Sequence, residues 1–119
     1  NKMEKIIKIP TTEEKIFRQY LEIFNPIIKL RSKELDVLSQ LLYFNDKLKD
    51  IPEEHRNKIL FDYDTKKEMQ NKIGLSGAYF DNCLSILRKK GIIINNKLIK
   101  NFLFYPDKDV KLTFNFVIK

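Results

Sequence analysis

A single histidine, a single cysteine and scattered carboxylates are the residues of this 119-residue chain that could support catalysis or hold a metal. His55 directly follows Glu53 and Glu54, and adjacent residues lack the spacing with which metal ligands converge on one ion. Cys83 falls on the apolar side of a helical pattern, where cysteine behaves as a small hydrophobe. The sequence contains no phosphate-binding glycine loop, nucleophile elbow or paired carboxylates. We therefore predict that the protein is not an enzyme and uses neither a metal nor a cofactor.

Basic residues are the more informative group. Residues 65–100 hold eight lysines and arginines against two acidic residues, so six of the chain's seven net positive charges lie in this third of the sequence. A positive field attracts polyanions such as nucleic acid or an anionic membrane surface, and charge alone does not choose between them. Lysines outnumber arginines by 19 to 4. Since arginine is the better marker of phosphate and base recognition, an ordinary solvated surface remains an alternative.

Composition narrows the class of protein. No apolar run approaches the roughly 20 residues of a membrane span, and one cysteine cannot form an intrachain disulfide. We expect a soluble cytoplasmic protein that binds no membrane, located in the host cytoplasm if it is viral; a place in the virion belongs to the alternative function given below. Lysine, isoleucine and asparagine, whose codons are AT-rich, are abundant, which suggests an AT-rich phage, plasmid or bacterium.

The first 30 residues predict a strand and a helix. The isoleucine-rich stretch 4–10 suits a short edge strand. Thr11 and Glu14 have the spacing of a capping box, and Asn25-Pro26 is expected to end the helix that follows. Its apolar positions recur three and four residues apart and are Phe17, Tyr20, Leu21 and Phe24.

A second helical pattern follows, with Ser32 as its expected N-cap. Its core positions are expected to be Leu35, Leu38, Leu41 and Leu42. Residues 49–64 are mostly polar, and we expect a loop there, with at most one helical turn, that leads to a short strand.

Residues 65–90 predict two helices joined by a tight turn. Thr65 and Glu68 have capping-box spacing, and Gly74 supplies a helix stop. Ser76 is expected to cap the next helix, which Gly91 ends. The expected buried positions of the two helices are Met69, Ile73, Phe80, Cys83, Leu84 and Leu87.

The remaining sequence predicts β-structure. Two β-rich runs flank Asn95-Asn96 and indicate a hairpin, because Asn tolerates the positive φ angles of a two-residue turn. Residues 110–119 alternate strictly and predict a strand. The aromatic residues of this region, which could stack on bases as in sheet-based RNA binders, are Phe102, Phe104, Phe114 and Phe116. Alternation favours the covered face of a sheet instead, and aromatic residues on both faces would make the outer one a partner interface.

The order helix, short strand, short helix, tight turn, longer helix and hairpin resembles the winged helix-turn-helix family of DNA-binding domains. The resemblance rests on MQNKIGLSGAYFDNCLSILRKKGII and covers residues 32–104. The matching junction residues are Ile73, Gly74, Leu75, Ser76, Leu87, Gly91 and Ile92. It implies an α+β fold, a three-helix core with a small antiparallel sheet or wing. The whole chain, 1–119, is then expected to be one such domain, with a flanking strand and helix at 1–31, the core at 32–104 and a C-terminal strand at 105–119.

The resemblance also implies how double-stranded DNA would be bound. The helix 76–90 would enter the major groove, and the hairpin would touch the adjacent backbone or minor groove. The candidates for base contact are Ser76, Tyr79, Asn82 and Ser85. The candidates for phosphate contact are Lys66, Lys67, Lys72, Arg88, Lys89, Lys97 and Lys100. The first turns of the helix carry no arginine to read guanine, and Asp81 would face phosphates unfavourably, so a G-rich site is not expected.

Taken together, the sequence predicts a small DNA-binding protein that regulates transcription or assists replication. The alternative is a winged-helix module for protein interaction within a larger assembly, such as a phage virion or a polymerase complex. A homodimer formed through residues 11–30 is compatible with either function.

Overall fold

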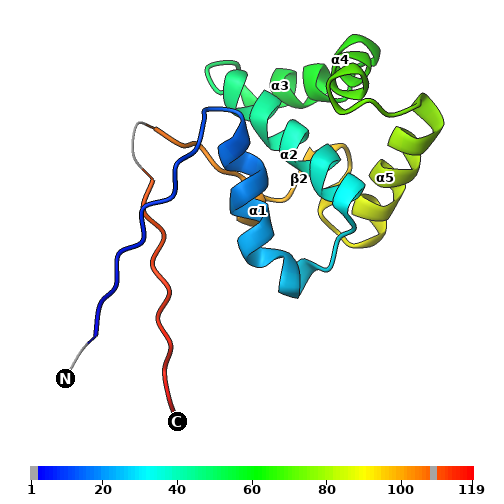
Figure 1. Ribbon diagram of the computed structural model, residues 1–119. Coiled ribbons are helices and arrows are strands. Elements are labelled where there is room, and N and C mark those ends of the chain that lie inside the picture. The colour runs from blue at the N-terminus through cyan, green and yellow to red at the C-terminus, as the bar shows by residue number, and fades with distance from the viewer. Residues whose placement is uncertain (1–2, 108–109) are drawn as a thin grey trace.

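The computed structural model of the protein describes residues 3–107 and 110–119, which form an α+β arrangement of five α-helices, one small sheet and a 3-10 turn (Figure 1). The helices are α1 (Lys15–Ile28), α2 (Ser32–Lys47), α3 (Glu53–Leu60), α4 (Tyr63–Ile73) and α5 (Gly77–Lys89). The antiparallel sheet pairs β1 (Ile93–Ile94) with β2 (Lys97–Leu98), and the 3-10 turn η1 spans Lys100–Phe102.

Helix α2 is the centre of the packing, because it contacts α1, α3, α4 and α5. The four leucines that the sequence assigned to its core face are buried, as predicted. Its N-cap is Arg31 rather than Ser32, which is the first helical residue. Glu34 accepts a hydrogen bond from the Arg31 backbone N–H at 2.9 Å, so the glutamate at the third helical position caps this end.

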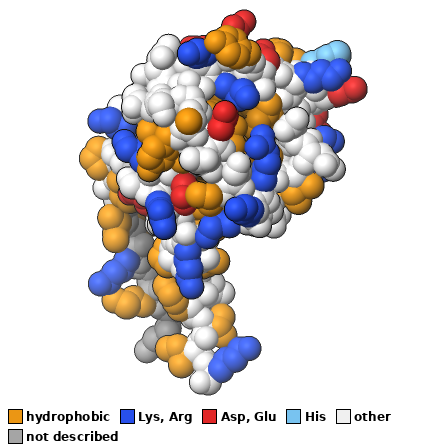
Figure 2. All heavy atoms as spheres, turned by 90° about the vertical axis from the view of Figure 1, so that its right-hand side faces the viewer, with side chains coloured by type: hydrophobic (Ala, Val, Ile, Leu, Met, Phe, Trp, Pro, Cys, Tyr) orange, Lys and Arg blue, Asp and Glu red, His pale blue; other side chains and the backbone are white. Residues whose placement is uncertain are grey.

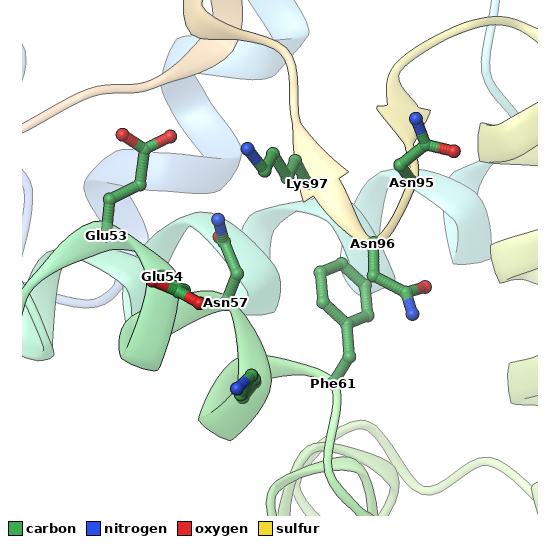
Figure 3. Close-up of a pocket in the computed structure, with 8 residues that line it drawn as sticks. Glu53, Glu54, Asn57, Phe61, Asn95, Asn96 and Lys97 are labelled. Carbon is green, nitrogen blue, oxygen red and sulfur yellow. The ribbon is translucent and has the colours of Figure 1, made fainter.

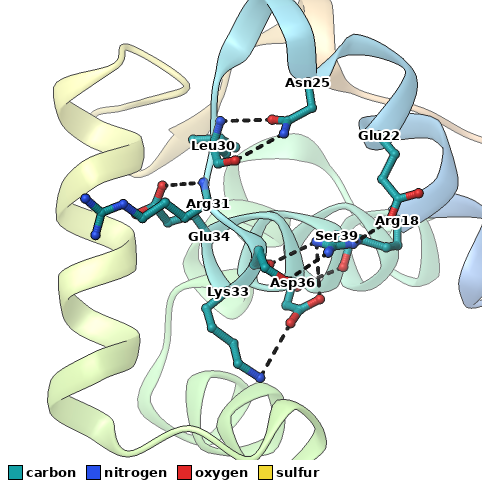
Figure 4. Close-up of polar contacts among 10 residues, drawn as sticks. Arg18, Glu22, Asn25, Leu30, Arg31, Lys33, Glu34, Asp36 and Ser39 are labelled. Carbon is teal, nitrogen blue, oxygen red and sulfur yellow. Dashed lines mark hydrogen bonds and ion pairs between the residues drawn. The ribbon is translucent and has the colours of Figure 1, made fainter.

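Helix α1 lies on α2 and differs from prediction at both ends. The Thr11 and Glu14 capping box is wrong: the Lys15 N–H donates to the Thr12 hydroxyl at 3.1 Å. Asn25-Pro26 does not end the helix, which continues through Pro26 to Ile28. The Asn25 amide holds the following turn, because it donates to the Leu30 carbonyl and accepts from the Leu30 N–H (Figure 4).

Polar contacts join α1 to the start of α2 (Figure 4). Arg18 donates to the Ser32 carbonyl at 2.9 Å and forms an ion pair with Asp36 at 3.3 Å. Phe17 and Leu21 are fully buried, whereas Tyr20 and Phe24 are half-buried. The helix is thereby held on both its apolar and its polar side.

The loop and strand expected for residues 49–64 are wrong, because α3 occupies Glu53–Leu60 and α4 begins at Tyr63. Pro52 is the N-cap of α3, and two glutamates follow in its first turn, where the helix dipole favours acidic residues. The N-cap of α4 is Asp62, whose carboxylate accepts from the Thr65 N–H at 2.7 Å. The predicted Thr65 and Glu68 capping box therefore lies one turn too late.

The hairpin prediction is confirmed by the pairing Ile93 with Leu98 and Ile94 with Lys97. Asn95 and Asn96 have φ values of 52° and 55°, which a two-residue type I′ turn requires.

The two predicted terminal strands are wrong for the residues that the structure describes. Residues 4–10 and 110–119 have no assigned strand and lead away from the helices (Figure 1). Positions 1–2 and 108–109 of the expected flanking segments lie outside the described residues. Phe104 packs at 4.1 Å, ring centroid to ring centroid, on Tyr20, and Phe102 packs against the core, whereas Phe114 and Phe116 are exposed. A covered face at residues 110–119 is therefore not observed.

Candidate nucleic-acid interface

The turn between α4 and α5 positions the helix that the sequence assigned to base contact. Gly74 adopts φ 78°, a left-handed conformation that ends α4 without steric cost. Leu75 is half-buried against the core, and its N–H donates to the Gln70 carbonyl at 3.1 Å. The Ser76 hydroxyl accepts from the Tyr79 N–H at 3.2 Å, which confirms Ser76 as the N-cap of α5.

One face of α5 anchors it and the opposite face is free. Phe80, Cys83, Leu84 and Leu87 are buried, as predicted. Burial raises the pKa of the Cys83 thiol, and the negative charges of Glu34 and Asp36 raise it further. This direction fits the role of Cys83 as a core residue. The helix is thereby fixed at its inner face, with its outer face available to a partner.

Four predicted contact residues share the exposed side of α5. Tyr79, Asn82, Ser85 and Lys89 are all exposed and follow one another at intervals of three or four positions. Ser76, at the start of α5, is exposed too. Figure 2 views the molecule from the side of α5, where basic side chains alternate with apolar and uncharged ones and acidic ones are few. The structure thus gathers the predicted base-contacting residues on one helix face.

The predicted phosphate contacts come from four elements. Lys67 is exposed and Lys66 half-buried on α4, while Arg88 and Lys89 form the basic last turn of α5. Lys97 lies on β2 and Lys100 on η1, and both residues are exposed. Helix α5 packs against both α4 and β1, so α5 lies between α4 and the hairpin strand β1 on the surface of the molecule.

Lys72 is engaged elsewhere, in contrast to the other predicted phosphate contacts. Its ammonium group lies 3.0 Å from a carboxylate oxygen of Glu14 and 4.6 Å from the ring centroid of Tyr43. Hydrogen bonds from Lys72 and then from Gln40 lower the pKa of the Glu14 carboxyl. Lys72 therefore fastens α4 to the segment that precedes α1.

Two further basic residues have structural roles that sequence reasoning missed. Lys90 donates to the backbone carbonyls of Ile28 and Lys29 at 3.2 and 3.0 Å, and so caps the C-terminal end of α1. Arg56 of α3 donates to the Tyr105 hydroxyl at 3.0 Å. Lys90 follows Ile28 by 62 positions and Lys29 by 61 positions in the sequence. A local sequence pattern gives no signal for these contacts.

An open cleft of about 870 Å³ separates the hairpin tip from α3 (Figure 3). Its lining residues are Glu53, Glu54, Asn57, Lys58, Phe61, Asn95, Asn96 and Lys97. Lys97 extends from β2 toward the side of α3 (Figure 3). The glutamates on the α3 wall disfavour a phosphate inside the cleft, so Lys97 would contact a DNA phosphate only with its side chain turned out of the cleft. Helix α3 was missed in the sequence, although Pro52 followed by two glutamates is a signal for a helix start.

The remaining candidate residues do not form a second site among the described residues. His55 is exposed in the first half of α3. Residues 3–107 and 110–119 contain no group of three His, Cys, Asp or Glu side chains placed to share a metal ion. In the same ranges, no helix has the length and apolar character needed to cross a bilayer.

Comparisons with known proteins found no matching family model, no matching curated protein sequence and no matching solved structure.

Proposed function

We propose that this protein is a winged helix-turn-helix DNA-binding protein in which α5 enters the major groove of double-stranded DNA. The observation that carries the proposal is the exposed strip of Tyr79, Asn82, Ser85 and Lys89 on a helix whose opposite face is buried. Regulation of transcription or assistance to replication is the role that fits a small protein of this kind.

Rigid attachment suits α5 to this task. The Gly74-Leu75-Ser76 turn sets its start, and four buried side chains fix its rotation about its own axis. A major groove admits an α-helix, and a helix held in one rotation turns the same side chains toward the groove whenever it binds. Asn82 would pair with adenine through its amide, and Tyr79 and Ser85 would contact neighbouring base edges or phosphates.

Most of the binding free energy would come from contacts with the phosphate backbone that flanks the major groove. Arg88 and Lys89 at the end of α5, Lys97 and Lys100 beyond it, and Lys66 and Lys67 on α4 supply the positive charge. Lys72 is omitted from this set because of its contact with Glu14. Such contacts release counterions from DNA, so affinity would fall steeply with salt concentration.

A charge-reversal pair tests the proposal. Lys89→Glu and Lys15→Glu alter net charge equally, and both lysines are exposed, but Lys15 begins α1 rather than lying on α5. We expect Lys89→Glu to weaken binding to a random AT-rich duplex of about 30 base pairs at least tenfold, and Lys15→Glu to change it much less. Fluorescence anisotropy at fixed salt measures both affinities.

The outcome separates a site from a general charge effect. Equal losses in the two variants would mean that only the overall positive field attracts DNA. No binding by the unaltered protein at low salt would reject the proposed function, and the protein-interaction alternative would replace it.

A further inference from the structure

The two ends of the described chain are apolar segments that the helices do not cover. We name residues 3–10 the N-terminal arm and residues 110–119 the C-terminal tail. Both project from the same side of the helical body in two perpendicular views (Figures 1 and 2). They account for the elongated dimensions of the molecule, 54 × 29 × 26 Å.

Large apolar side chains dominate both segments and are exposed. Ile7 is 79% exposed in the arm, and Phe116 and Ile118 are 90% and 96% exposed in the tail. The other exposed apolar residues of the two segments are Met3, Ile6, Ile9, Val110, Leu112, Phe114 and Val117. Soluble monomers seldom leave contiguous apolar surface of this extent in water.

Among the described residues, the Pro10 carbonyl of the arm accepts a hydrogen bond from the Gln19 side chain at 3.4 Å, and the backbone of both segments forms no hydrogen bond with another backbone group. The described residues of arm and tail belong to no strand ladder, although their sequences are rich in β-branched and aromatic residues. An extended chain with free N–H and C=O groups is a template for pairing with another strand. Two strands alone would be marginally stable in water, whereas a larger sheet that covers its apolar face is stable.

We infer that the N-terminal arm and C-terminal tail form a shared β-sheet with the same segments of a second copy of this chain, which makes the protein a homodimer. A twofold axis places identical surfaces together. Apolar residues alternate with polar or basic ones along most of the tail, and Val117 breaks the alternation near its end. An extended tail therefore has one apolar face, formed by Val110, Leu112, Phe114, Phe116 and Ile118. In the dimer, the apolar face of each copy covers that of the other.

Area fits a second copy, and charge does not prevent the pairing. The arm has one acidic and two basic residues and the tail has two basic residues, so each copy brings a net charge of only +3 on exposed side chains, whose repulsion salt screens. A standard interface buries about 800 Å² on each partner, and ten large apolar side chains that each offer on the order of 100 Å² provide an area of that size. A polyanion such as DNA would gain little from a surface with so few basic residues.

This inference is independent of the proposed function and differs from the dimer expected through residues 11–30. The test is sedimentation equilibrium of the full chain at micromolar concentrations, with Phe114→Asp/Phe116→Asp and the control Ile27→Asp. Ile27 is an apolar residue of α1 that is 79% exposed, so it probes the other dimer surface. The unaltered chain should show twice its 14.3 kDa mass.

We expect the tail variant to raise the dimer dissociation constant at least about a hundredfold, since two buried aromatic side chains are lost from each copy. Ile27→Asp should leave the dimer intact. Circular dichroism should show the same helix content in all three proteins, because the altered residues lie outside the core. Amides of residues 3–9 and 110–119 should also exchange more slowly with solvent as protein concentration rises.

Three results would overturn the inference. The first is a monomer at all concentrations, and the second is dissociation caused by Ile27→Asp alone. The third is a monomer that sediments with vesicles of mixed neutral and anionic phospholipid through Phe114 and Phe116, because the apolar segments would then be a lipid-binding device. None of these results alters the anisotropy comparison of Lys89→Glu with Lys15→Glu, so dimerisation and DNA binding fail or succeed separately.

Discussion

At the scale of single residues, neighbours rather than residue type decide what each lysine does. Lys72 pairs with Glu14, Lys90 caps α1, and Lys89 remains exposed on α5. The sequence placed Lys72 and Lys89 together as phosphate contacts. It could not separate them, because Glu14 lies 58 positions before Lys72 and only the folded chain brings the two side chains together.

Lys72→Met should therefore affect mainly the stability of the fold, whereas Lys67→Met, on the same helix, should affect mainly DNA binding. Loss of Lys72 should lower the free energy of unfolding near neutral pH by less than about 1 kcal/mol, because the pair is partly exposed and screened by solvent. Lys67 is exposed on the same helix, so its substitution should leave stability unchanged and weaken DNA binding more than Lys72→Met does. Urea denaturation and fluorescence anisotropy measure the two quantities.

The stability loss in Lys72→Met should depend on pH in a defined direction. Lys72 lowers the pKa of Glu14 in the folded state, so the pair stabilises the fold fully above the ordinary carboxyl pKa. This stabilisation disappears as pH falls through the lowered folded-state pKa. A difference in stability between the unaltered protein and Lys72→Met that is as large in strong acid as at neutral pH would contradict the pairing of Lys72 with Glu14, because the contact of Lys72 with the Tyr43 ring does not depend on the ionisation of Glu14.

At the scale of elements, local turn chemistry could be predicted from the sequence, whereas the absence of partners for the two predicted terminal strands could not. Gly74, Ser76 and Asn95-Asn96 determine their own backbone conformation, so the turn, the α5 cap and the hairpin are all as predicted. The start of α4 was misplaced because Thr65 and Asp62 offer competing caps three residues apart. Alternation in residues 110–119 indicates which side chains share a face, but it does not supply the neighbouring strand on which β-structure depends.

The hairpin turn gives a prediction at this scale. Replacing both Asn95 and Asn96 with Ala should lower the free energy of unfolding by about 1–2 kcal/mol, since alanine resists the positive φ that both positions require. Replacing both with Gly removes the same amide side chains but accepts this φ, so it should keep the hairpin. Chemical denaturation measures the stability of both variants.

Amide exchange at Ile99 locates the effect, because its N–H donates to the Ile92 carbonyl at 3.0 Å in the hairpin. Exchange at this amide should accelerate in the Ala variant and not in the Gly variant. Equal stability of the two variants would show that the turn conformation contributes nothing to the fold.

At the scale of the whole molecule, the protein presents two chemically different surfaces. One is the polar and basic face built from α5, its flanking elements and the hairpin, and the other is formed by the apolar arm and tail. The first suits a polyanion and the second suits another polypeptide chain. The sequence predicted where positive charge concentrates, but it predicted covered terminal strands where the structure has exposed segments.

Chemical-shift mapping by NMR tests the DNA-binding proposal most directly, because it locates the contact without altering a residue. On titration with an AT-rich duplex at low salt, we predict that amide signals of residues 76–90 and 93–100 shift most, those of residues 63–73 shift less, and those of α1 remain unchanged. Shifts confined to α1, the arm or the tail, or the absence of any shift, would contradict the assignment of α5 as the DNA-contacting helix.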